Sequence, residues 1–145
     1  MEIIKQFVFS FMSTIGFAVL FNSPKKSIVH AGLVGAIGWM FYYISFITMD
    51  SYVASTFFGA LTVGLLGEFL ARKNKKPATL YITAGIIPLV PGAGAYYTML
   101  YLIENNFSQA ATKGAETLFI AAAISMGIII SSLFSRSIKR VRQKD

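Results

Sequence analysis

The sequence predicts an all-α integral membrane protein, with five transmembrane helices in a single domain over residues 1–145. Of these residues, 55% are hydrophobic and 13% are charged, whereas soluble domains average about 45–50% and about 25%. The apolar residues form five long blocks, each able to supply the roughly 17–25 residues that cross a bilayer. Most lysines and arginines lie in short clusters just outside these blocks, as expected at the cytoplasmic ends of membrane helices.

The first two helices are predicted over about residues 3–21 and 28–48, separated by the turn-forming residues 22–24. The first half of the second helix carries small residues at helical spacing, which let a neighbouring helix approach closely: Ala31, Gly32, Gly35, Ala36 and Gly38. Its second half is aromatic, as is typical of a membrane interface: Trp39, Phe41, Tyr42, Tyr43 and Phe46.

The third helix is predicted over about residues 53–71, antiparallel to the second because the turn at Asp50 and Ser51 is very short. Glu68 lies inside this helix, about one turn before Arg72. A carboxylate within a membrane span suggests a coupling group for protons or cations. The alternative is an ion pair between Glu68 and Arg72, four residues apart, that reaches the interface.

The fourth helix is predicted over about residues 79–103, with a break at 88–92. Pro88 and Pro91 each remove a backbone donor and clash with the preceding turn. Interrupted backbone at membrane depth is tolerated where it is buried in protein or lines a watery cavity. The break is therefore a candidate transport site, and the alternative is a kink with a purely structural role.

A second half-helix should begin near Gly92, where free N–H groups and the positive end of the helix dipole favour a carboxylate or phosphate. The substrate site predicted on this basis comprises the backbone of the break and nearby polar side chains: Pro88, Pro91, Gly92, Gly94, Tyr97, Thr98 and Asn22. Tyr97 and its neighbour Tyr96 could equally be interfacial anchors. A dinucleotide fingerprint is rejected because Tyr97 replaces its third glycine and no strand is predicted before it.

A polar loop is expected over residues 104–114, and the fifth helix over about 115–135. Eleven of the thirteen lysines and arginines fall in the segments 25–26, 72–76 and 136–144. Five helices place these segments on one side of the membrane. That side should be the cytoplasm, which puts the N-terminus outside and the C-terminus inside.

The composition also limits the chemistry. The net charge of +7 is explained by the clusters beside the membrane blocks, so no nucleic acid partner is expected. The chain has no cysteine and a single histidine, His30, which makes a metal site improbable. No set of acid, base and nucleophile and no phosphate-binding loop is visible, so we expect neither an enzyme nor a bound cofactor.

The run from Gly85 to Gly92, Gly-Ile-Ile-Pro-Leu-Val-Pro-Gly, resembles the threonine/serine exporter family. Glu68-x-x-x-Arg72 and Pro77-Ala78 precede this run and extend the resemblance, which covers essentially the whole chain. More narrowly, the chain is similar to the C-terminal half of these exporters, which in some bacteria is a separate small subunit. Ala84 departs from the family pattern, because many relatives have a proline there.

The resemblance implies a multi-pass protein of the bacterial inner membrane, surrounded by lipid, that exports threonine and serine with a larger partner subunit. That partner would resemble the N-terminal half of the exporter and carry a soluble domain. Three alternatives remain open. The chain could export dicarboxylates such as succinate, act as a non-transporting scaffold, or form a homo-oligomeric metabolite pore.

Overall fold

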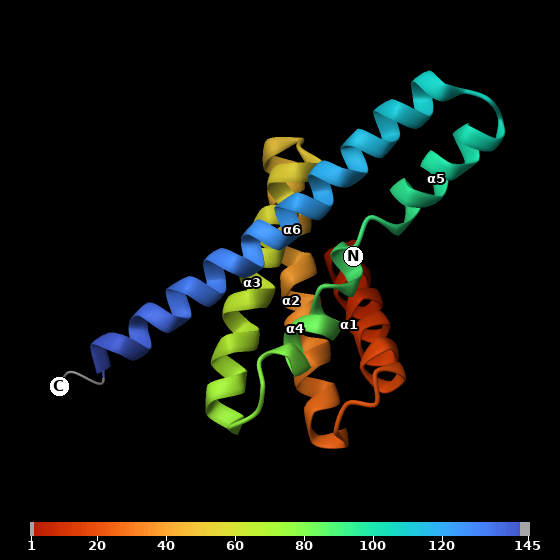
Figure 1. Cartoon of the computed structure of the whole chain (residues 1–145). Coiled ribbons are helices and arrows are strands. Elements are labelled where there is room, and N and C mark those ends of the chain that lie inside the picture. Colours follow the sequence, from red (N-terminus) through yellow and green to blue (C-terminus); the bar gives the residue numbers. More distant parts are fainter. Residues whose placement is uncertain (1, 143–145) are drawn as a thin grey trace.

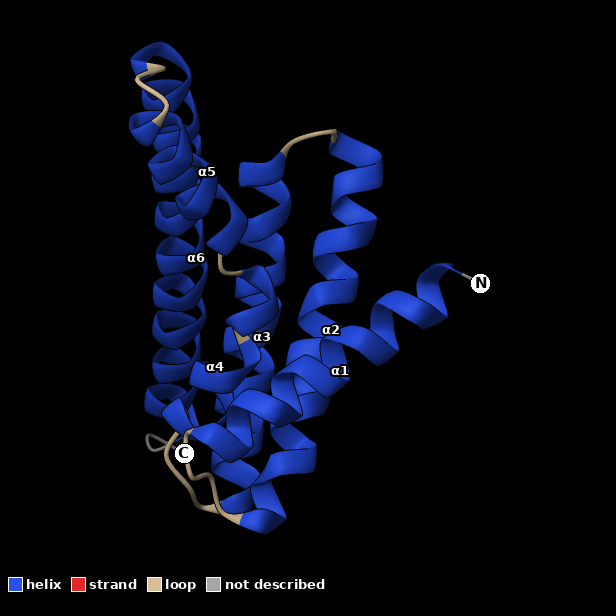
Figure 2. Ribbon diagram, turned by 90° about the vertical axis from the view of Figure 1, so that its right-hand side faces the viewer, coloured by secondary structure: helices blue, strands red, loops and turns tan. Residues whose placement is uncertain are grey.

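The computed structural model describes residues 2–142, and residues 136 and 138–142 by their backbone alone. Its elements are α1 (Glu2–Leu20), α2 (Lys25–Met49), α3 (Tyr52–Asn74), α4 (Thr79–Gly85), the short 3₁₀ helix η1 (Ile87–Leu89), α5 (Gly92–Ile103) and α6 (Phe107–Arg142). The described residues contain no strand (Figure 2). The all-α prediction is confirmed.

Four helices, α1, α2, α3 and α6, are each long and apolar enough to cross a membrane. A fifth span is formed if α4 and η1 are joined to α5, with a bend of 51° between the two parts. The predicted helix count, including the broken fourth helix, therefore agrees with the structure.

The start of the last helix was predicted incorrectly. Residues 104–114 were expected to be a loop and the helix to begin near residue 115, but α6 begins at Phe107 and continues to Arg142. Its 36 residues correspond to about 54 Å at about 1.5 Å per residue. Polar side chains mark where a helix leaves an apolar environment, but they do not end the helix. Here α5 packs against the first part of α6.

Small residues bring the helices of the bundle together, as predicted for α2. Gly32 lies against Phe11 and Ile15 of α1, where an added Cβ would come within 2.8 Å of the Ile15 side chain. Gly127 of α6 meets the backbone of α3, at 2.8 Å from a Cβ position to the Leu61 nitrogen. Close approach of this kind is the usual basis of packing between membrane helices.

The broken helix is shared between two parts of the molecule. α4 packs against α2 and α3, whereas α5 packs against α6. Figure 1 shows that α6 crosses the bundle diagonally and that α5 and the start of α6 form a hairpin leading away from it. The break is therefore the point at which the chain passes from the bundle to this hairpin.

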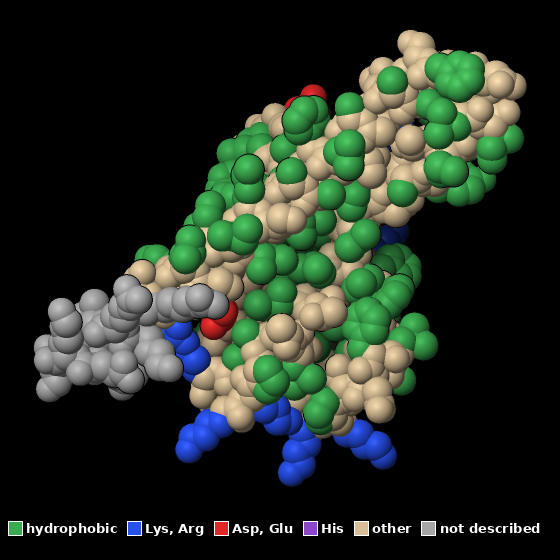
Figure 3. Space-filling view, in the orientation of Figure 1, with side chains coloured by type: hydrophobic (Ala, Val, Ile, Leu, Met, Phe, Trp, Pro, Cys, Tyr) green, Lys and Arg blue, Asp and Glu red, His purple; other side chains and the backbone are tan. Residues whose placement is uncertain are grey.

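The basic turns lie at one end of the bundle. The Lys76 ammonium donates to the Ser27 hydroxyl at 2.9 Å, which joins the turn after α3 to the start of α2. Figure 3 shows most of the described lysine and arginine side chains at this end of the molecule. This clustering is what the topology prediction requires, although the direction across a membrane stays a prediction.

Candidate functional site

The break between α4 and α5 follows the two prolines. η1 contains Pro88, Val90 is extended, and Pro91 precedes the first residue of α5. The amide of Val90 donates to the Ile87 carbonyl at 3.2 Å, and that of Gly92 donates to the Val90 carbonyl at 2.8 Å. Pro91 has no side-chain acceptor to cap α5. The predicted break at 88–92 is confirmed.

A cavity of about 260 Å³ opens beside this break. Its lining comes from α2, α3, the break, α5 and α6: Trp39, Tyr42, Tyr52, Thr56, Pro88, Leu89, Val90, Pro91, Ala93, Gly94, Lys113, Glu116, Thr117 and Ile120. Sites for drug-sized ligands usually measure about 300–1,000 Å³. The smaller volume here suits a metabolite of a few heavy atoms.

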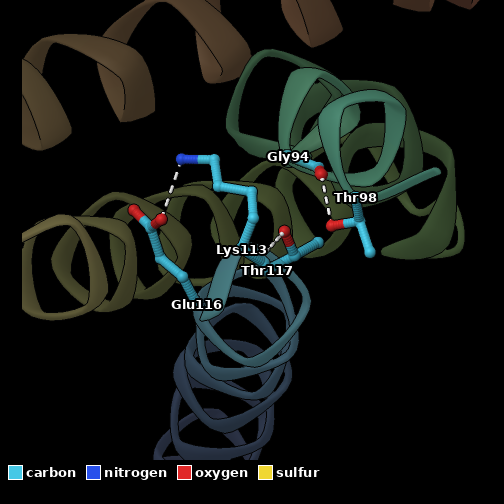
Figure 4. Close-up of polar contacts among 5 residues, drawn as sticks. All are labelled: Gly94, Thr98, Lys113, Glu116 and Thr117. Carbon is cyan, nitrogen blue, oxygen red and sulfur yellow. Dashed lines mark hydrogen bonds and ion pairs between the residues drawn. The ribbon is translucent and has the colours of Figure 1, made fainter. Parts of the chain in front are cut away.

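Two charged side chains of α6 form part of the cavity wall. The Lys113 ammonium and the Glu116 carboxylate lie 2.8 Å apart, with 36% and 31% of their side chains exposed. Figure 4 shows both side chains on the same side of α6, reaching toward each other. Among the described residues the other ion pair is Lys5–Glu2, which lies near the start of α1 and is more exposed.

Just after the break, α5 packs closely against α6 along a contact that we call the seam. A Cβ at Gly94 would collide with the Thr117 hydroxyl, and one at Gly114 would lie 3.2 Å from the Thr98 methyl group. The Thr98 hydroxyl donates to the Gly94 carbonyl at 2.8 Å, and the Thr117 hydroxyl donates to the Lys113 carbonyl at 2.7 Å (Figure 4). Two glycines thus allow α5 to lie close to α6.

Some of the predicted substrate residues line the cavity, and the others lie outside it. Pro88, Pro91 and Gly94 line the cavity. Gly92 is exposed beside it, with nothing within 4 Å of an added Cβ. Thr98 lies in the seam.

Two of the predicted polar contacts do not line the cavity. The Tyr97 side chain is 45% exposed and stacks on Tyr101. Asn22 is exposed in the turn after α1, with a φ of 55°. Its neighbours in that turn, Phe21 and Ser23, line a different hollow with Pro77 and Thr79, at the basic end of the bundle.

Glu68 and Arg72 lie away from the cavity, on the face of α3 that packs against α6. The Ser132 hydroxyl donates to the Glu68 carboxylate at 3.3 Å, and the Arg72 guanidinium donates to the Ser135 carbonyl. The structure therefore gives each residue a partner on α6 in place of the ion pair considered above.

Sequence reasoning missed much of the cavity wall. Lys113 and Glu116 were assigned to a loop and to the first turn of the last helix, and Tyr52, Thr56 and Thr117 were not singled out. Trp39 and Tyr42 were interpreted as interfacial, but both line the cavity, and the Trp39 indole donates to the Gln6 amide oxygen at 2.9 Å. One available signal was the opposite charge of Lys113 and Glu116, which lie three residues apart on an apolar helix.

The single histidine, His30, lies in the second turn of α2. A ring nitrogen of His30 lies 3.1 Å from the Lys26 carbonyl oxygen, one turn earlier in α2. No group of three or more metal-binding side chains occurs among the residues that the structure describes.

Comparisons with known proteins show which family the chain resembles. The family model described as "Threonine/Serine exporter, ThrE" matches residues 6–134. An uncharacterized protein of Haemophilus influenzae is 26% identical over 99% of this chain and 50% of its own length. A threonine/serine exporter of Corynebacterium glutamicum is 29% identical over 86% of this chain and 25% of its own length. The chain therefore spans half or less of these relatives, and no solved structure matches it.

Proposed function

The chain belongs to the threonine/serine exporter family, and from this membership we propose that it forms the membrane part of a secondary exporter for small polar metabolites that carry a carboxylate. Threonine and serine are the first substrates to test. Membership of a transporter family points away from an enzyme, and the apolar helices make this a multi-pass bacterial membrane protein.

The observation that supports this proposal best is the cavity at the break in the fourth span. Open backbone, several hydroxyl groups and two charges meet there, on helices that would otherwise be embedded in lipid. In the proposed mechanism the substrate carboxylate lies at the N-terminus of α5, beside Pro91, Gly92 and Gly94, where the helix dipole stabilises negative charge. Thr98 and Tyr97 lie one turn further along α5 and would contact the substrate on its way out.

We further propose that a larger partner subunit completes the exporter. The chain spans 50% of one relative and 25% of the other, which leaves room in each for a further part. Inverted repeats of two such halves are common in secondary transporters, with the substrate site at their interface. The cavity at the break would then open toward the partner.

The direct test is efflux of preloaded threonine from cells that express the chain with its partner. Gly94→Leu should abolish efflux at an unchanged protein level, because a side chain there collides with Thr117 and displaces α5 from the cavity wall. Gly16→Leu is the matched control, since a Cβ at Gly16 meets nothing within 4 Å. Unchanged efflux in the Gly94 variant would contradict the proposed path.

The alternatives give different results in the same assay. A scaffold role requires full efflux by the partner without this chain. A homo-oligomeric pore requires flux through liposomes that contain this chain alone. A dicarboxylate exporter requires succinate efflux that exceeds threonine efflux.

A further inference from the structure

We propose that the Lys113–Glu116 pair is the charge-recognition element of the cavity, and that it selects zwitterionic amino acids over dicarboxylates. This inference rests on the proposed export function and specifies its substrate class. In the bound state, the substrate carboxylate would lie between the N-terminus of α5 and Lys113, which line the same cavity, and Glu116 would hold the substrate ammonium.

The composition of the cavity wall carries this inference. Of the residues that line the cavity, Lys113 and Glu116 are the two with charged side chains, and the others are apolar, aromatic or hydroxyl-bearing. The wall is therefore neutral overall but carries one positive and one negative charge, which lie 2.8 Å apart. A zwitterion has the same pattern in reverse, so it can pair with both charges and leave neither unpaired.

The position of the pair makes it available to a ligand. About a third of each side chain is exposed, and both extend from one face of α6 (Figure 4). Partly exposed ion pairs contribute little stability because solvent competes with them, typically about 0–1 kcal/mol. Exchange of this weak internal pair for two contacts to a ligand is therefore feasible.

A dicarboxylate fits the same wall poorly. One of its carboxylates could pair with Lys113, but the second would lie in a small cavity with Glu116, and like charges in close contact repel. Glu116 would also lose its cation to the ligand and remain unpaired. Such an unpaired charge in a partly desolvated site is unfavourable.

Binding to the purified chain in nanodiscs, together with its partner where this is required, tests the inference. The probes are radiolabelled L-threonine with L-threonine methyl ester, N-acetyl-L-threonine and succinate as competitors. The unmodified protein should prefer threonine to all three. Glu116→Gln and Lys113→Gln should each weaken threonine binding by about tenfold or more, the scale of one charge-assisted hydrogen bond.

The competitors assign each charge separately. Glu116→Gln should abolish the preference for threonine over N-acetylthreonine, which lacks the ammonium group. Lys113→Gln should abolish the preference over the methyl ester, which lacks the carboxylate. Glu2→Gln and Lys5→Gln are matched controls, because they break a pair of the same spacing outside the cavity.

Three results would overturn the inference. Threonine could bind both cavity variants as tightly as the unmodified protein, succinate could displace radiolabelled threonine as well as unlabelled threonine does, or the control variants could lose as much affinity. In each case threonine is still bound, so the proposed export function stands. If the unmodified protein with its partner neither binds nor exports threonine, the proposed function fails and this inference fails with it.

Discussion

At the scale of single residues, glycine positions control how closely the helices approach. Gly127 of α6 faces backbone atoms of α3, with 2.8 Å between a built Cβ and the Leu61 nitrogen and 2.9 Å to the Phe57 oxygen. Backbone cannot rotate away as a side chain can. A methyl group at this position must therefore separate two helices.

We expect Gly127→Ala to lower the stability of the folded protein by about 1–3 kcal/mol, the usual range for overpacking. Thermal unfolding in detergent, followed by circular dichroism, measures this loss. Gly16→Ala is the control, because nothing lies within 4 Å of its Cβ, and helix propensity favours alanine over glycine by about 0.5–1 kcal/mol. Equal melting temperatures for the two variants would contradict the packing argument.

Glu68 supports a second prediction at this scale. If its carboxylate couples export to a proton gradient, Glu68→Gln should retain the contact to Ser132 but abolish the dependence of efflux on external pH. The measurement is threonine efflux at several external pH values, with Ser132→Ala as a control that removes the hydroxyl but keeps the carboxylate. A normal pH dependence in Glu68→Gln would assign this residue a structural role in joining α3 to α6.

Residues of the site could be predicted from the sequence only where the backbone itself is unusual. Pro88, Pro91 and Gly94 could be found because prolines and glycines in an apolar span have a local meaning. Lys113 and Glu116 could not be placed, because their position depends on how α6 packs against α5, and that arrangement is tertiary. Asn22 was predicted at the site from its polarity, but the structure places it in the turn that ends α1.

At the scale of whole helices, the two parts of the fourth span meet at a bend of 51°, and the residues at this bend line the cavity. Hydropathy located the spans well because bilayer thickness fixes their length. It failed at the start of α6, where residues 107–114 include several polar side chains yet are helical, because hydropathy reports environment and not backbone conformation.

Removal of both prolines should straighten this span. The double variant Pro88→Ala/Pro91→Ala restores two backbone donors and favours a continuous helix. Because the chain has no cysteine, spin labels at Thr83→Cys and Met99→Cys can report the distance by electron paramagnetic resonance. The distance should change to roughly 24 Å, the value for a continuous helix between these positions at about 1.5 Å per residue, and efflux should fall.

A second label pair, Phe69→Cys and Met126→Cys, places one label on α3 and one on α6, at side chains that are 62% and 60% exposed. This distance should not change if the bundle stays intact. An unchanged distance between the labels at 83 and 99 would mean that the packing of α5 on α6, and not the prolines, maintains the bend.

At the scale of the whole molecule, the distribution of lysines and arginines predicts the orientation of the chain across the membrane. The turns that carry residues 25–26 and 72–76 lie together at one end of the bundle, linked by the bond from Lys76 to Ser27. The turn between α5 and α6 contains Glu104 but no lysine or arginine. The positive-inside rule then predicts that the basic end faces the cytoplasm and the α5–α6 turn faces outside.

Labelling of single cysteines with a membrane-impermeant maleimide tests this direction in right-side-out vesicles. Glu104→Cys should react in intact vesicles, whereas Lys73→Cys should react only after permeabilisation. Both side chains are exposed in the structure, so a difference in reactivity reports the side of the membrane and not burial. The reverse pattern would contradict the predicted orientation and place the basic end of the bundle outside the cell.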